Sequence, residues 1–146
     1  MVKPEGAHQL KIAVIDGQGG GVGKTLVAGL KEKYGSTIEI IALGTNALAT
    51  SAMMKAGADG GATGENAIVF NADKVDMITG PIGIIMANAM LGELTPSMAR
   101  AVGESSCKKI LVPIEKCNII IAGNRTMPMQ MLINDVISKV GKLIDS

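Results

Sequence analysis

Residues 12–25 read IAVIDGQGGGVGKT, and this stretch decides the fold. The apolar, β-branched run at its start predicts a strand buried on both faces, and the amphipathic residues 26–31 that follow predict a helix. Five of the seven residues 17–23 are glycines, which permit positive φ and the close approach of a ligand. A glycine loop between a strand and a helix N-terminus binds phosphate on free backbone N–H groups. We therefore predict a nucleotide- or phosphate-binding loop; the alternative is a tight turn without a ligand.

The rest of the chain alternates between apolar runs and amphipathic segments. Because short turns separate them, right-handed βαβ units and a parallel sheet are expected. Residues 57–66 form a second glycine-rich loop, and residues 67–70 fit either a short strand or the first turn of a helix, with the helix favoured. Strands are expected at 10–16, 37–43, 75–79 and 109–114, and helices at about 22–34, 47–56, 83–91, 95–103 and 129–144.

One further strand is expected at residues 119–122. Only four residues separate it from the preceding strand, too few for a helical crossover, so it should pair antiparallel at an edge. The predicted fold is therefore α/β, a single-domain Rossmann-like three-layer sandwich whose mostly parallel sheet has an antiparallel edge strand. The domain covers residues 11–146, and residues 1–10 form an N-terminal extension.

The composition narrows the classes of partner. The net charge is +1 and charged residues make up 18 % of the chain, with 1 % aromatic residues, so the basic patches and stacking rings of a nucleic-acid binder are missing. No apolar run approaches the roughly 20 residues that span a bilayer. Such sparse charge predicts a homodimer that buries apolar surface. Cys107 and Cys117, without a signal peptide or a metal-ligand spacing, are expected to be free thiols in a reducing cytoplasm.

The glycine loop resembles two other phosphate-binding loops in part. Gly23-Lys24-Thr25 matches the end of the phosphate loop of ATPases and GTPases, but that loop begins on a glycine where this chain has Gln18. The variant loop of partitioning ATPases is similar to residues 20–25, although its extra lysine falls on Gly19. Hydrolysis would also need an acidic residue after a later strand to hold magnesium, for which Glu115 is the late candidate.

The spacing Gly-x-x-x-Gly-x-Gly fits at Gly17, Gly21 and Gly23 and is similar to the cofactor loop of short-chain dehydrogenases. That resemblance implies NAD or NADP, with its pyrophosphate at residues 21–23. The family's catalytic Tyr-x-x-x-Lys pair is missing, because the only tyrosine is Tyr34 and Ile38 stands four residues later. If the protein is an enzyme, the resemblance implies an NAD(P)-dependent oxidoreductase.

The turns that follow the predicted strands should meet at one edge of the sheet. Ligands bind outside the carboxyl ends of parallel strands, so the turns at 16–23, 44–46, 80–83 and 114–117 are expected to form one crevice for a nucleotide or another phosphorylated small molecule. At 44–46 small polar residues replace the acidic residue that would bind an adenosine ribose. The predicted ligand-binding residues are Gly17, Gln18, Gly19, Gly20, Gly21, Val22, Gly23, Lys24, Thr25, Gly44, Thr45, Asn46, Gly80 and Pro81.

No recognisable catalytic set accompanies the loop. The only histidine is His8, in the extension, and Cys117 has no identifiable base. The acid–base candidates are Asp16, Glu65, Glu93 and Glu115. Asp16 is expected to accept hydrogen bonds from the loop amides, because its charge would oppose a phosphate. Glu65 belongs to the second glycine loop, a candidate lid.

Four strings spread over the chain are more specific. They are residues 15–21 (IDGQGGG), 42–47 (ALGTNA), 57–67 (GADGGATGENA) and 80–84 (GPIGI). They resemble a small bacterial family known as a domain of unknown function with a Rossmann-like, nucleotide-binding interpretation. This resemblance implies the fold but no activity and no catalytic residue.

Three hypotheses follow. The first is a module that binds a nucleotide or dinucleotide, NAD or NADP first among them, and acts as a sensor or accessory subunit. The second is a small oxidoreductase with its substrate between Gly80-Pro81 and the Glu65 loop. The third is an NTPase with a phosphate loop.

Overall fold

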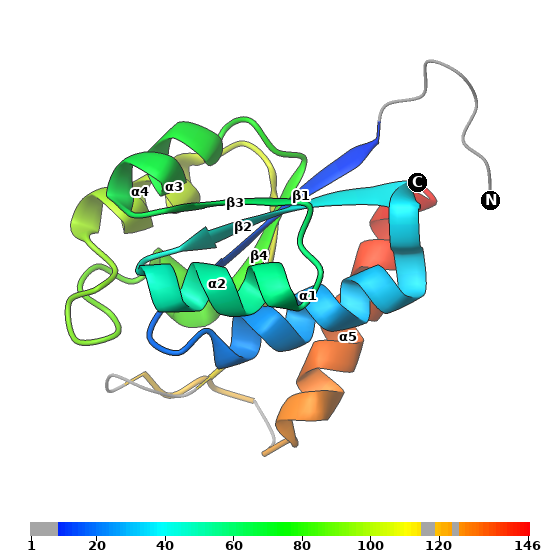
Figure 1. Ribbon diagram of the computed structural model, residues 1–146. Coiled ribbons are helices and arrows are strands. Elements are labelled where there is room, and N and C mark those ends of the chain that lie inside the picture. The colour runs from blue at the N-terminus through cyan, green and yellow to red at the C-terminus, as the bar shows by residue number, and fades with distance from the viewer. Residues whose placement is uncertain (1–8, 115–118, 124–125) are drawn as a thin grey trace.

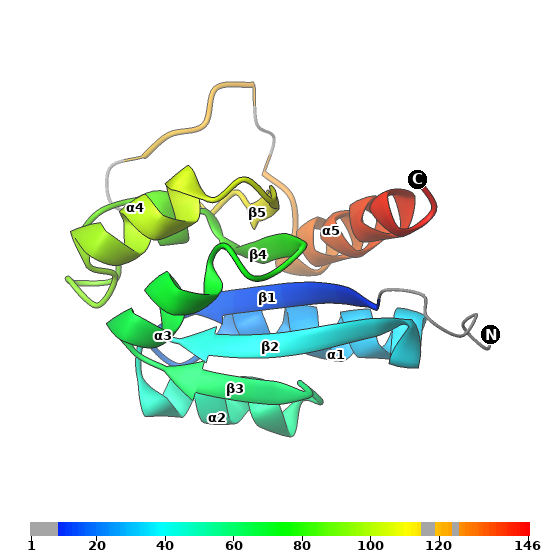
Figure 2. The ribbon, with the colours of Figure 1, turned by 90° about the horizontal axis from the view of Figure 1, so that it is seen from above.

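The computed structural model describes residues 9–114, 119–123 and 126–146, and within them one five-stranded sheet organises the chain. The strands lie in the order β3-β2-β1-β4-β5 (Figure 2), and every neighbouring pair is parallel. The strands are β1 Leu10–Asp16, β2 Ile38–Gly44, β3 Gly60–Thr63, β4 Met77–Pro81 and β5 Lys108–Val112. The helices are α1 Gly21–Tyr34, α2 Ala47–Lys55, α3 Glu65–Asn71, α4 Pro96–Glu104 and α5 Met129–Ile144, with short 3₁₀ turns η1 Gly35–Thr37 and η2 Ile82–Ile85.

Helices cover both faces of the sheet, which gives three layers (Figure 1). Alternate residues of β1 enter two separate cores. Ile12 and Val14 pack with α1, α2 and α5, whereas Ala13 and Ile15 pack with α3, η2 and α4. All four side chains are fully buried, as expected of a central parallel strand. The α/β, Rossmann-like sandwich predicted from the sequence is therefore confirmed.

The strand order has a topological switch beside β1. The chain runs from β1 outward to β2 and β3, then returns through α3 to β4 on the other side of β1. Crevices for ligands form at the carboxyl ends of the strands where the order reverses in this way. Here the switch lies between β1 and β4, so the loop after β1 and the turn after β4 flank it.

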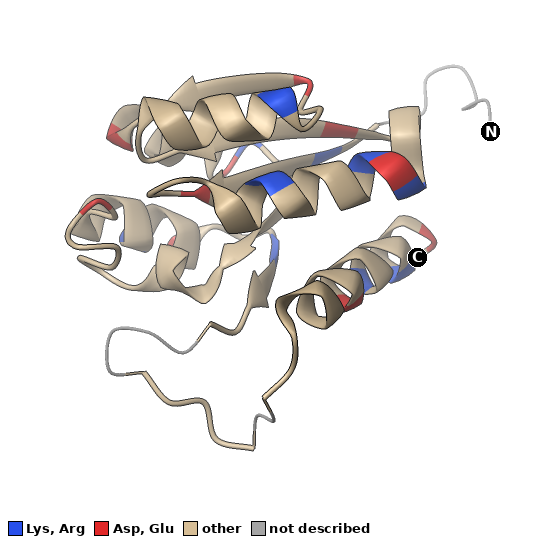
Figure 3. Ribbon diagram, turned by 60° about the horizontal axis from the view of Figure 1, so that its bottom comes forward, with Lys and Arg blue, Asp and Glu red and all other residues tan. Residues whose placement is uncertain are grey.

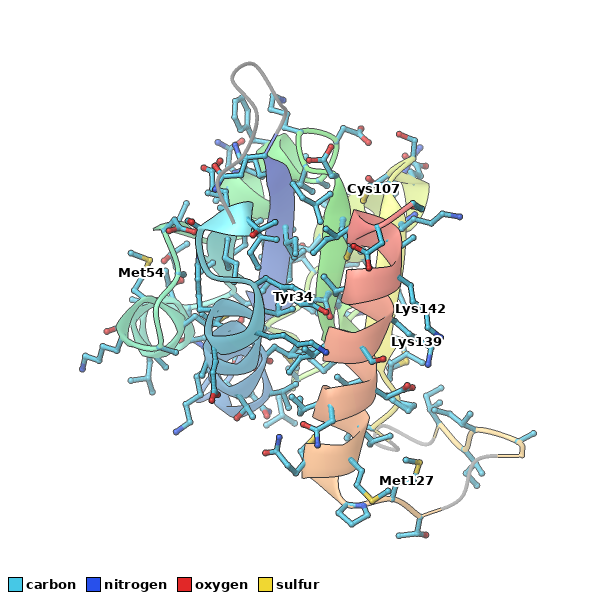
Figure 4. The ribbon with its side chains drawn as sticks, turned by 90° about the vertical axis from the view of Figure 1, so that its right-hand side faces the viewer. Tyr34, Met54, Cys107, Met127, Lys139 and Lys142 are labelled. Carbon is cyan, nitrogen blue, oxygen red and sulfur yellow. The ribbon has the colours of Figure 1, made fainter. Side chains whose placement is uncertain are left out.

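Helix α5 is held against α1 by the only tyrosine. The hydroxyl of Tyr34 donates to the carbonyl of Ile137 at 2.5 Å, and burial raises the pKa of this phenol. Figure 4 shows Tyr34 lying between the two helices. Gly141 leaves room for the ring, because a Cβ there would overlap the hydroxyl. Tyr34 is thus a structural residue at the far end of α1 from the glycine loop.

Most of the predicted elements are confirmed, including the helix favoured at residues 67–70, which is part of α3. The prediction of a loop at 57–66 missed β3. This strand has only four residues, two of them glycines, so its sequence carries no apolar alternation. It forms because its backbone pairs with the carboxyl end of β2.

Two predictions are wrong. No antiparallel edge strand forms at 119–122: these described residues are irregular, and the side chain of Ile120 is 85 % exposed, so its apolar character does not mark burial. The helix expected at 83–91 is limited to η2, because Asn88, Met90 and Leu91 have φ values of 66°, 60° and 56°. This left-handed conformation cannot continue a right-handed helix.

His8, Glu115 and Cys117 lie outside the described residues. Of the expected extension, only Gln9 and Leu10 are described, and Leu10 begins β1. Cys107 is a free thiol that accepts a hydrogen bond from the hydroxyl of Ser105 at 3.1 Å. In the part of the chain that the structure covers, no helix combines the length and the apolar character needed to cross a membrane. In the view of Figure 3, basic and acidic residues are both spread over several elements of the ribbon.

Candidate functional site

A cavity of about 470 Å³ opens at the carboxyl edge of the sheet, beside the glycine loop that follows β1. It lies at the topological switch, between the loop after β1 and the turn after β4. Its walls come from the glycine loop, the first turn of α1, the segment after β4 and the end of the β5 region. The lining residues are Asp16, Gly17, Gln18, Gly19, Gly20, Gly21, Val22, Pro81, Gly83, Met86, Ala89, Met90, Leu91 and Ile114.

The carboxylate of Asp16 fastens the glycine loop to the end of β1. One oxygen accepts the N–H of Gly17 at 2.8 Å and the other accepts the N–H of Gly23 at 2.7 Å, while the side chain is 5 % exposed. Gly23 is required for this contact, because a Cβ at that position would lie 2.9 Å from the Cβ of Asp16 and 2.6 Å from the sulfur of Met53. The prediction that Asp16 binds loop amides is confirmed, and its role is structural.

The N-terminus of α1 faces the cavity, and the Asp16 carboxylate already accepts one of its first N–H groups, that of Gly23. The cap residue is Gly20, with φ 73°, and the first turn contains no acidic residue. Within the described residues, the N–H groups of Gly21 and Val22 have no hydrogen-bond acceptor. Both residues line the cavity. Two backbone donors and the positive end of the helix dipole are therefore available to an anion there.

The five loop glycines fall into two groups. A Cβ at Gly17, Gly20 or Gly23 would collide with neighbouring atoms at 2.5–2.9 Å, so the fold itself needs glycine at these positions. A Cβ at Gly19 or Gly21 would meet nothing within 4 Å, and neither residue has a left-handed φ. The fold therefore gives no reason for glycine at 19 and 21, both of which line the cavity.

Glu93 ties three segments together on the β2 side of the loop. Its Oε1 accepts the hydroxyl of Thr45 at 2.7 Å, the side-chain amide of Asn46 at 2.7 Å and the N–H of Gln18 at 2.9 Å. The same amide of Asn46 donates to the carbonyl of Gln18 at 2.9 Å. We call these four residues the Glu93 cluster. The hydrogen bonds, first that from Thr45 and then that from Gln18, lower the pKa of the Glu93 carboxyl.

The Glu93 cluster should make stability depend on pH. Since the folded pKa lies below the ordinary value of 4.5, the stabilisation by ionised Glu93 is complete above that value and is lost as the pH falls through the folded pKa. Glu93→Gln should therefore cost about 1 kcal/mol at pH 7, a modest amount because the group is partly exposed to solvent. Urea unfolding of both proteins should show this difference shrinking below pH 4.5. A difference that is the same at pH 7 and pH 3 would contradict the assignment.

The wall opposite the glycine loop is apolar. Four of its side chains are Pro81, Met86, Leu91 and Ile114. Met90 also lines the cavity, but its sulfur lies against Gly17 of the loop. Residues 88–94 fold into a compact loop, in which the N–H of Asn88 donates to the carbonyl of Leu94 and the N–H of Leu94 to that of Ala89. Leu91 projects from this loop with 98 % of its surface exposed.

The structure brings only part of the predicted site together. The predicted residues 17–22 and Pro81 line the cavity, as do Gly83 and Ile114 of the predicted turns. The others do not line it. Lys24 is exposed in the second turn of α1, and Thr25 donates its hydroxyl to the carbonyl of Gly21 at 2.9 Å. Three predicted glycines pack against protein: Gly23 against Asp16, Gly44 against Thr50 and Gly80 against β1. Thr45 and Asn46 belong to the Glu93 cluster.

Sequence reasoning missed the contribution of residues 86–91. In the expected helix these side chains would have pointed to different faces. The observed loop instead presents Met86, Ala89, Met90 and Leu91 to the cavity. The helix-breaking residues Asn88 and Gly92 were the available signal. Glu65 does not line the cavity: it begins α3 and accepts the hydroxyl of Thr95 at 2.5 Å. The structure therefore does not place Glu65 at the site, and a lid formed by its loop stays a prediction.

Two solved structures resemble this chain, and the first of them supports the fold. The dodecameric FMN-dependent Ubix-like decarboxylase of Escherichia coli O157:H7 is similar in structure with a TM-score of 0.53 and 15 % identity, over 94 % of this chain and 96 % of that one. A universal stress protein in complex with cAMP has a TM-score of 0.42 and 21 % identity, over 71 % and 96 % of the two chains. No curated protein matches the sequence significantly. Nothing in these comparisons links the chain to short-chain dehydrogenases or to NAD(P).

The family match covers almost the whole chain. Residues 11–145 fit the model of a domain of unknown function, DUF3842. This range begins within β1 and ends just beyond α5, so it includes every element that forms the cavity. The chain therefore belongs to the DUF3842 family.

Proposed function

We propose that the protein is a binding or sensing module that holds the phosphate end of a nucleotide at the N-terminus of α1. The observation that carries this proposal is the pair Gly19 and Gly21. Both line the cavity at the N-terminus of α1, and packing and backbone conformation require glycine at neither. The absence of a side chain there leaves space in which a phosphate can approach the free N–H groups.

The charges around the cavity are consistent with recognition by backbone donors. Asp16 is the only ionisable side chain among the described lining residues, and both its oxygens accept loop amides. Among the described residues, a phosphate would therefore meet N–H groups and the helix dipole rather than a lysine or arginine. The volume of about 470 Å³ lies within the range of small-molecule and cofactor sites.

A binding role is favoured over catalysis because no acid–base pair lines the cavity among the described residues. The oxidoreductase hypothesis placed a substrate beside Glu65, whose carboxylate is bonded to Thr95 away from the cavity. NAD and NADP remain candidate ligands on the sequence spacing alone. The FMN of the structurally similar decarboxylase adds a flavin nucleotide to the candidates.

The NTPase hypothesis is less well supported. Helix α1 begins at Gly21, so Lys24 and Thr25 lie in its second turn and outside the cavity lining. The phosphate-loop mechanism requires these two residues to reach the phosphates and the magnesium ion. Magnesium-dependent release of phosphate from ATP or GTP, abolished in Lys24→Ala, would restore this hypothesis.

Gly21→Ala should separate stability from binding. The methyl meets no atom within 4 Å, and replacing a helical glycine restricts the unfolded chain, so the free energy of unfolding should rise by about 0.4–1 kcal/mol. Because Cβ atoms point towards the N-terminus of a helix, the same methyl should weaken nucleotide binding at least about tenfold, a loss of ~1.4 kcal/mol. Urea unfolding and titration calorimetry with AMP, FMN and NAD⁺ measure the two effects.

Gly103→Ala is the matched control. Gly103 lies in α4, where a Cβ also meets nothing within 4 Å, and it does not line the cavity. It should gain similar stability with no change in affinity. Equal affinity of parent and Gly21→Ala for every bound nucleotide would contradict the proposed site.

The homodimer expected from the sparse charge stays a proposal. Several large apolar side chains are exposed, among them Phe70 at 57 % and Leu48 at 68 %. Light scattering should give twice the mass of 15.0 kDa, and a monomer mass would contradict it.

A further inference from the structure

We propose that the ligand is a mononucleotide, with one phosphate end and one heterocyclic ring, and that the ring packs on the apolar wall of the cavity rather than extending over the carboxyl end of β2. This inference rests on the proposed function and specifies its ligand class. It follows from a difference between the two sides of the glycine loop: protein atoms fill the side towards β2, and the side towards β4 and β5 is open.

The side towards β2 is already occupied by protein. A Cβ at Gly17 would lie 2.5 Å from the sulfur of Met90, 2.5 Å from the hydroxyl of Thr45 and 3.2 Å from Oε1 of Glu93. These atoms therefore pack directly on the loop. In dinucleotide-binding domains the end of the second strand holds the adenosine ribose. Here the polar groups at that position, those of Thr45 and Asn46, are bonded to Glu93.

The Glu93 cluster also opposes a second nucleotide half electrostatically. The hydrogen bonds to Glu93 hold the carboxylate ionised, and no Lys or Arg is among the described residues that line the cavity. A second phosphate placed over β2 would approach the negative charge of Glu93, and the described lining residues supply no cation to compensate that charge. To bind there, a dinucleotide would have to break the bonds of Thr45 and Asn46 to Glu93.

The side towards β4 and β5 is open and apolar. Pro81, Met86, Ala89, Leu91 and Ile114 line the cavity there, and none of these side chains carries a charge. Methionine is flexible and polarisable and makes favourable contacts with aromatic rings. A flat, uncharged heterocycle fits this chemistry, whereas a second phosphate or an unsubstituted sugar does not. Ring at one end and phosphate at the other is the composition of a mononucleotide, either a purine nucleoside monophosphate or a flavin mononucleotide.

The test compares ligands with and without a heterocycle, and with one or two nucleotide halves. Titration calorimetry is run with AMP, GMP, FMN, ribose 5-phosphate and NAD⁺. At least one of the three mononucleotides should bind about tenfold or more tightly than ribose 5-phosphate, because ribose 5-phosphate lacks the heterocycle that a mononucleotide buries. The same mononucleotide should bind at least about tenfold more tightly than NAD⁺. Comparing AMP and GMP with FMN decides between a purine and a flavin.

Met86→Ala tests the wall itself. It should weaken the preferred mononucleotide about five- to tenfold and leave ribose 5-phosphate unchanged, because only the ring contacts this side chain. Met131→Ala, which removes an exposed methionine of α5 outside the cavity lining, is the matched control and should change neither affinity. If Met86→Ala does not fold, Met86→Gln keeps the length of the side chain and should show the same selective loss.

The outcomes separate the two proposals. NAD⁺ binding as tightly as the best mononucleotide, or an equal loss for ribose 5-phosphate in Met86→Ala, would overturn the mononucleotide inference and leave the phosphate site intact. Failure of every probe, ribose 5-phosphate and NAD⁺ included, to bind the parent protein would overturn the proposed function.

Discussion

Gly80→Ala is expected to destabilise the protein by more than about 3 kcal/mol, a large part of the roughly 5–15 kcal/mol by which domains are stable. Its Cβ would overlap the backbone oxygen of Ile15 in β1. That strand cannot move aside, because β1 lies at the centre of the sheet and its side chains are buried on both faces. Urea unfolding measures the effect, or the yield of folded protein does where the variant does not fold.

Gly83→Ala is the control for this prediction. It adds the same methyl group three residues later, where the nearest atom is the Cβ of Ala89 at 3.5 Å, an ordinary contact. Its free energy of unfolding should stay within about 1 kcal/mol of the parent. Equal effects of the two substitutions would show that the approach of β4 to β1 is looser than described.

Asp16→Ala should remove about 3 kcal/mol of stability and also abolish nucleotide binding. The substitution leaves the N–H groups of Gly17 and Gly23 without the carboxylate that accepts them, and each orphaned buried donor costs about 1–3 kcal/mol. Without this fastening the glycine loop no longer holds the cavity in one shape. Unfolding in urea and calorimetry with AMP and FMN measure the two losses.

Asp135→Ala provides the comparison for a carboxylate outside the site. Asp135 forms an exposed ion pair with Lys139, one turn along α5, and such pairs contribute less than about 1 kcal/mol. It should lose little stability and no affinity. An Asp16→Ala protein that retained both its stability and its nucleotide affinity would show that the loop amides do not depend on this carboxylate.

Helices and strands are predicted best from the sequence where burial of one or both faces sets the pattern of apolar side chains. The continuous apolar run of β1 and the 3.6-residue period of α5 are direct consequences of burial, so both elements were placed with nearly the observed bounds. β3 could not be found in this way, because two glycines and two small residues pair through the backbone alone. The segment at 88–91 differs from the expected helix because Asn88, Met90 and Leu91 are left-handed, in a loop closed by backbone hydrogen bonds between Asn88 and Leu94.

The candidate site was predicted in outline and not in detail. The five loop glycines are equivalent in the sequence, and only the surrounding atoms separate Gly19 and Gly21 from the three that packing requires. Thr45 and Asn46 were predicted to contact the ligand because they follow a strand. Their partner Glu93 is 48 and 47 residues away in sequence, a contact that no local pattern reveals.

The most direct test of the phosphate site follows individual backbone amides by NMR during a titration with AMP and FMN. We predict saturable shifts of the amide signals of Gly21 and Val22, because their free N–H groups become donors to the phosphate, with the amide of Gly103 unmoved. Saturable binding with no shift at Gly21 and Val22 would contradict the account, since the nucleotide would then be held elsewhere on the protein.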